Sequence, residues 1–141
     1  MKKSIADKWI AELLSGKHKQ GNRLLHTRND EFCCLGVACK MIGAKGFLVH
    51  NMLCYRYTMG DGNGGDSAVL SDDIMEALTM KTACGNVKLT KKEVKYLNNK
   101  YNNIYDTYAD NQEGTDLTRL NDHGVSFSDI AGIIKKHYKE L

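Results

Sequence analysis

Apolar residues recur at helical spacing near the start of the chain, at Ile5, Trp9 and Leu13. Residues three or four positions apart fall on one face of an α-helix, so this spacing predicts an amphipathic helix. Ser4 followed by Asp7 resembles a capping box, in which the two side chains would satisfy the first backbone N–H groups. Gly16 is the predicted end of this helix.

The next apolar segment runs almost without interruption from Phe32 to Ile42. Periodicity alone does not distinguish a helix from a strand in such a run, but its length and the small residues Gly36 and Ala38 favour a buried helix. Residues 47–59 are rich in β-formers and predict a strand or hairpin. We interpret the glycine-rich residues 60–66 as a flexible hairpin turn, because they lack the Gly-Lys-Ser/Thr ending of a P-loop and the terminal Glu of an EF-hand.

The second half of the chain predicts further helices. Ser71 begins one, and Thr90 with Glu93 forms a capping box before a longer amphipathic pattern that continues to Tyr108. Residues 117–141 predict two helices joined at Gly124, as in the first part of a helix-turn-helix unit, without a following recognition helix. We therefore expect DNA binding to be weak and independent of sequence.

These patterns predict one α+β domain over residues 1–141, mostly helical, with about five helices and a small central β-hairpin or sheet. The net charge of +3 is too small to favour duplex binding as the main activity. No segment is apolar for long enough to span a membrane, and the first residues do not read as a signal peptide. Five cysteines, with Cys33 and Cys34 adjacent, make a poor disulfide framework, so we expect a reducing cytoplasm.

Three sequence pieces occur in an order that resembles a family of small, mostly uncharacterised phage-encoded proteins: KWIAELLSGKHKQG, FCCLGVAC and LTRLNDHGVSFSDIAGII. Together they cover about a third of the chain. The resemblance implies a phage or prophage accessory protein that acts in the cytoplasm of the bacterial host. It does not imply an enzymatic activity.

The cysteines do not predict a metal centre, and we expect no cofactor. Structural zinc sites pair their ligands two to four residues apart, whereas Cys34 and Cys39 are farther apart and have no second close pair. A cysteine nucleophile with His26, His50 or His123 as its base is chemically feasible, but the pattern favours small buried thiols. Tyr96, Tyr101, Tyr105 and Tyr108 could stack on bases, although their helical spacing favours the core or an oligomer interface.

Two polar segments hold the candidate ligand-binding residues. Arg23, His26 and Arg28 lie in a basic stretch that would otherwise be a solvated loop. The second segment, the turn at 119–124, contributes Arg119, Asn121, Asp122 and His123, where Asn121 and Gly124 already have a capping role. Arg56 lies in the β-rich segment between them.

These residues, together with the resemblance to phage-encoded proteins, favour a protein that binds a small anionic, nucleotide-derived signal and sequesters it from a host immune pathway without turnover. Arginines supply bidentate phosphate contacts, and Asn or Asp can recognise hydroxyls or base edges. A small chain builds a deep pocket most easily between subunits, so we expect a homo-oligomer. Two alternatives stay open: a module that docks on a host enzyme and inhibits it, and a small hydrolase that uses Asp122 and His123.

Overall fold

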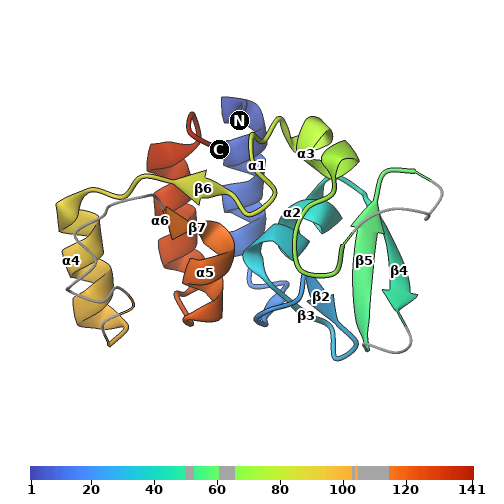
Figure 1. The fold of residues 1–141 in the computed structure, drawn as a ribbon, viewed down its shortest axis with the longest axis horizontal. Coiled ribbons are helices and arrows are strands. Elements are labelled where there is room, and N and C mark those ends of the chain that lie inside the picture. The colour runs from blue at the N-terminus through green and yellow to red at the C-terminus, as the bar shows by residue number, and fades with distance from the viewer. Residues whose placement is uncertain (50–52, 61–65, 103, 105–114) are drawn as a thin grey trace.

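The computed structural model describes residues 1–49, 53–60, 66–102, 104 and 115–141, and within them it contains six helices and seven strands (Figure 1). The helices are α1 (Lys3–Leu14), α2 (Cys34–Met41), α3 (Asp72–Leu78), α4 (Lys91–Lys100), α5 (Leu117–Asp122) and α6 (Phe127–His137). The strands are β1 (Lys19–Gln20), β2 (His26–Thr27), β3 (Glu31–Phe32), β4 (Lys45–Val49), β5 (Cys54–Thr58), β6 (Asn86–Val87) and β7 (Thr115–Asp116). The predicted α+β fold class is confirmed, with six described helices in place of about five.

The main sheet has five strands in the order β1-β3-β2-β5-β4. Only β1 and β3 run parallel, and the other neighbouring pairs are antiparallel. The predicted hairpin is confirmed as β4 and β5, but its turn lies between Val49 and Cys54. Residues 60–66 instead follow β5 and lead toward α3, so their interpretation as the hairpin turn is wrong; residues 61–65 themselves lie outside the described part of the chain.

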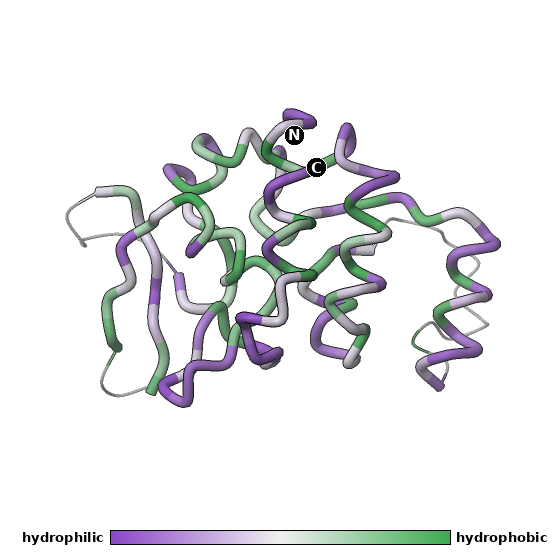
Figure 2. Tube along the Cα trace, turned by 180° about the vertical axis from the view of Figure 1, so that it is seen from behind, coloured by the Kyte–Doolittle hydropathy of each residue, from purple (hydrophilic) through white to green (hydrophobic). Residues whose placement is uncertain are grey.

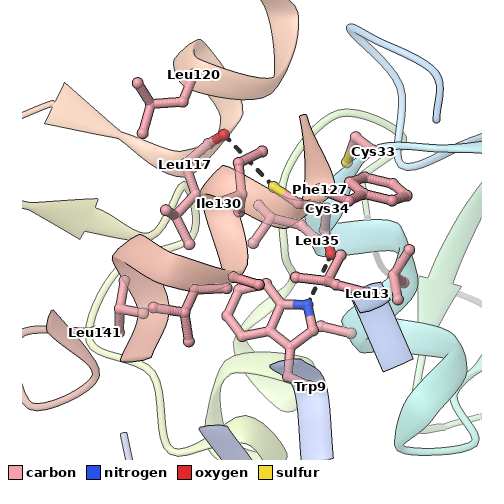
Figure 3. Close-up of a cluster of buried hydrophobic side chains, with 14 of the residues drawn as sticks. Trp9, Leu13, Cys33, Cys34, Leu35, Leu117, Leu120, Phe127, Ile130 and Leu141 are labelled. Carbon is pink, nitrogen blue, oxygen red and sulfur yellow. Dashed lines mark hydrogen bonds between the residues drawn. The ribbon is translucent and has the colours of Figure 1, made fainter. Parts of the chain in front are cut away.

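The helical core forms where α1 packs against α2 and α6. Trp9 of α1 is fully buried at its centre, and its indole N–H donates a hydrogen bond to the carbonyl of Cys34 over 3.0 Å (Figure 3). A buried indole needs such a partner, since an unpaired polar group in a core is costly. Leu117 and Leu120 of α5 and Phe127 and Ile130 of α6 belong to the same cluster (Figure 3).

Several predicted helix boundaries are confirmed. Thr90 and Glu93 form the capping box of α4. Ser126 caps α6 through the backbone N–H of Asp129, and Gly124 adopts a left-handed φ of 78° in the turn before it. No described helix is long and apolar enough to cross a lipid bilayer.

Two helix predictions were wrong in detail. The helix α1 begins two residues earlier than expected, with Lys2 at its N-cap, so Ser4 lies inside the helix and cannot cap it. Asp7 pairs with Lys3 over 2.7 Å instead. The helix α4 ends at Lys100, because Asn102 has a left-handed φ of 55° that an α-helix does not accommodate.

Candidate functional site

The side chain of Asn121 joins the end of α5 to the loop after β1. Its Oδ1 accepts hydrogen bonds from the Nε2 of Gln20 and from the backbone N–H of Cys34, each over 3.2 Å. Its Nδ2 donates to the carbonyl of Gly21 over 2.7 Å, and the residue is 1% exposed. Asn121 therefore fixes the position of the turn relative to the loop.

The next residue, Asp122, holds Arg23 in an uncommon conformation. Its Oδ1 accepts a hydrogen bond from the backbone N–H of Arg23 over 2.6 Å. Arg23 has a φ of 64°, in the left-handed region that costs a non-glycine residue roughly 1–2 kcal/mol. The contact with Asp122 uses only the backbone of Arg23, whose side chain is exposed. Asp122 of α5 therefore sets the position of the loop that carries the guanidinium.

Arg119 and His123 lie on the same turn and are both exposed. The Nδ1 of His123 is 3.1 Å from the carbonyl oxygen of Arg119, and since a carbonyl only accepts, this nitrogen carries the proton. Asp122 and His123 thus contact different partners instead of pairing with one another as an acid–base dyad would. The geometry gives the hydrolase alternative no support.

His26 is placed in the main sheet and is 7% exposed. Its ring stacks on Phe32 and Tyr55, with centroids 3.9 and 4.3 Å away. One ring nitrogen is 3.0 Å from Asp30 and the other is 2.8 Å from the hydroxyl of Tyr57. His26 is therefore not part of a solvated loop, and its contacts serve the sheet; its predicted role in ligand binding stays a prediction.

Arg28 and Arg56 lie at the sheet, Arg28 as an exposed residue just after β2 and Arg56 within β5. The backbone N–H of Arg28 donates to the carbonyl of Leu53 over 2.9 Å, just before β5. Arg56 is a half-buried residue of β5 opposite Phe47. The eight candidate residues consequently fall into two groups: Arg23, Arg119, Asn121, Asp122 and His123 meet at the loop–turn junction, and His26, Arg28 and Arg56 lie on the sheet.

The buried His26 predicts a loss of stability in acid. Burial lowers its pKa below the usual 6.5, although the hydrogen bond to Asp30 opposes the shift. The unfolded chain then binds a proton at His26 at higher pH than the folded chain does. The contribution of His26 to the free energy of unfolding is therefore full above about pH 6.5 and is lost as the pH falls through the pKa of the folded state.

We expect the free energy of unfolding, measured by urea titration, to decrease between about pH 7.5 and about pH 5.5. His26→Phe should be less stable at neutral pH but show a smaller decrease, whereas His123→Ala, at an exposed position, should keep the wild-type decrease. The same pH dependence in wild type and His26→Phe would contradict this assignment.

The cysteines are core residues, as predicted. Cys33, Cys34, Cys39 and Cys54 are buried, and burial raises the pKa of the Cys34 and Cys39 thiols. The Sγ of Cys33 accepts a hydrogen bond from the backbone N–H of Gly36 at the start of α2. His50, one of the bases considered for a cysteine nucleophile, lies outside the described residues. In the described part of the chain, no three His, Cys, Asp or Glu residues are placed to hold a metal ion.

Tyr96 is 51% exposed on α4, so the expected core position is wrong for this residue, whereas an oligomer interface stays a prediction. Tyr101 is half-buried and its hydroxyl lies 2.5 Å from Asp129; Tyr105 and Tyr108 lie outside the described residues. The exposure of Tyr96 depends on how α4 packs against the rest of the molecule, and the periodicity of the helix does not determine that.

The searches of curated proteins and of solved structures found no match to this chain. A family model described as a domain of unknown function, DUF8296, matches residues 1–138, nearly the whole chain. The chain therefore belongs to the DUF8296 family.

Proposed function

We propose that this protein binds a small anionic, nucleotide-derived ligand at the junction of the loop at 20–23 and the turn at 119–124. In a bacterial cell it would act as a phage-encoded counter-defence protein that withholds such a signal from a host immune pathway, without turnover. The observation that carries the binding proposal is the hydrogen bond between Asp122 and the backbone of Arg23, which joins two polar segments 99 residues apart.

The chemistry of the junction supports an anionic ligand. Arg23 and Arg119 each carry a planar guanidinium, which matches the geometry of a phosphate group, and His123 adds a ring whose Nε2 is the nitrogen not engaged with Arg119. Asn121 and Asp122 are committed to Gln20, Gly21, Cys34 and Arg23, so we assign them positioning roles. Strained backbone held in place by tertiary contacts, as at Arg23, is frequent at binding sites.

The junction lies at the surface, with Arg23, Arg119, Asp122 and His123 all exposed. Small ligands bind tightly where most of their surface is buried. We therefore propose that a second copy of the chain covers the ligand, in a symmetric dimer or a multiple of one. Native mass spectrometry of protein purified from bacteria with an active defence system would report both the subunit count and any retained small molecule.

Arg23→Ala should weaken ligand binding without unfolding the protein. A charge-assisted hydrogen bond contributes about 1.5–3 kcal/mol, so loss of the guanidinium should raise the Kd about ten- to a hundredfold in calorimetry. Arg28→Ala removes the same charge from the sheet group and is the matched control, with nearly unchanged affinity expected. Equal loss in both variants would show that overall charge, and not the junction, determines binding.

His123→Ala should likewise weaken binding while its thermal melt and circular dichroism stay near wild type, because His123 is exposed.

To separate sequestration, hydrolysis and docking on a host enzyme, the protein is incubated with cyclic and ADP-ribose-type nucleotides and then denatured by heat. Sequestration returns the intact nucleotide from the protein. Hydrolysis products would overturn the proposal in favour of an enzyme, and a nucleotide that never binds would favour a docking module.

A further inference from the structure

The positive charge of this protein is concentrated on two adjacent helices. Exposed lysines project from α4 and α6: Lys91, Lys92, Lys95, Lys100, Lys135 and Lys136. The same two helices contain only two carboxylates, Glu93 and Asp129, and so carry a net charge of +4, whereas the whole chain carries +3. Figure 2 shows α4 at the edge of the molecule with hydrophilic positions along most of its length.

A shallow groove of about 140 Å³ lies between these helices. Buried Leu97 and Ile133 give it an apolar lining, and the half-exposed ring of Tyr96 lies beside them. Gly132 of α6 also lines the groove, and a Cβ added there would meet nothing within 4 Å. The groove therefore combines an aromatic ring with open apolar space, and exposed lysines surround it.

The carboxylates of Glu93 and Asp129 also line the groove, and each holds one lysine in place. Asp129 pairs with Lys100 over 2.8 Å, and Glu93 pairs with Lys136 over 3.1 Å. The ammonium of Lys100 also lies 5.5 Å from the centre of the Tyr96 ring and donates to the Tyr96 hydroxyl. These contacts orient both the ring and the cations at the groove.

We propose that the surface of α4 and α6 binds single-stranded nucleic acid, with a base stacked on Tyr96 at the groove and phosphates contacted by the lysines. Stacking platforms flanked by cations are the common design for sequence-independent single-strand binding. Two other anionic partners fit this surface less well. An acidic protein would use the positive charge but not the exposed ring of Tyr96. A nucleic-acid duplex keeps its bases stacked inside and could not place one against Tyr96.

Fluorescence anisotropy with labelled single strands of about 12 nucleotides, the size of one such site, tests the proposal. Oligothymidine and oligouridine are both used, so that DNA and RNA are compared. We expect wild-type protein to bind both strands in about 50 mM salt and to lose most of this affinity by about 200 mM. A duplex of the same length should bind more weakly.

Three variants and one control define the site. Tyr96→Ala should weaken binding about 5- to 100-fold through lost stacking. Gly132→Leu should do so by filling the groove, where the structure has room for a side chain. Lys92→Ala should reduce the slope of log K against log salt by about 0.7, whereas Lys8→Ala, an equal charge change on α1, should leave affinity unchanged.

The proposal would be overturned if Tyr96→Ala and Gly132→Leu both kept wild-type affinity while circular dichroism confirmed that they fold. Binding of the duplex or of polyglutamate as tightly as the single strand would also overturn it. So would the absence of binding at low salt. Arg23→Ala should retain the oligonucleotide affinity, because the loop–turn junction contributes no residue to this groove.

Discussion

Replacing Gly36 with alanine is expected to destabilise the protein severely. Gly36 lies in α2, and a Cβ at this position would be 1.7 Å from the carbonyl oxygen of Leu25 and 2.6 Å from its carbonyl carbon. Those atoms are backbone, and the same carbonyl accepts a hydrogen bond from the N–H of Cys33 over 3.2 Å. The helix would have to move away from the loop before β2.

Such a shift disrupts the tightly packed core around Trp9 and should cost about 3 kcal/mol or more, a large part of the ~5–15 kcal/mol that stabilises a domain. The measurements are soluble yield, near-ultraviolet circular dichroism and the urea unfolding midpoint. The matched control is Gly132→Ala on α6, where a Cβ meets no atom within 4 Å. Because alanine is the better helix former, we expect that variant to be as stable as wild type or more stable by up to about 1 kcal/mol.

The second large effect is expected for Asn121→Ala. This change removes three hydrogen bonds and leaves the buried N–H of Cys34 and the carbonyl of Gly21 without their partner. An unpaired buried polar group costs about 1–3 kcal/mol, so the free energy of unfolding should fall by about 3 kcal/mol or more. Urea titration followed by circular dichroism measures the loss.

The neighbouring Asp122→Ala is the control for this prediction. Asp122 is exposed and makes one hydrogen bond to the backbone of Arg23, so the expected loss of stability is about 1 kcal/mol or less. If Asn121→Ala were as stable as wild type but failed to bind ligand, Asn121 would contact the ligand directly and its positioning role would be wrong.

The local signals in the sequence were sufficient for most of the helices. Capping residues such as Thr90 with Glu93, and the periodic apolar face around Trp9, act through residues that are neighbours along the chain, so they can be recognised without the fold. The buried helix at 34–41 and the burial of Cys33 and Cys34 could also be predicted, because an uninterrupted apolar run has to be covered on all sides.

The tertiary structure alone determined the sheet beyond the hairpin of β4 and β5, and both candidate surfaces. The strands β1, β2 and β3 have two residues each, too few for a recognisable pattern, and His26 is buried because β2 pairs with both β3 and the distant β5. The meeting of Arg23 with Asp122 likewise depends on chain topology, since no local pattern links residues 99 positions apart. From the sequence, the lysines of α4 and α6 are indistinguishable from ordinary solvent-exposed lysines. They form one basic surface only because the two helices lie side by side.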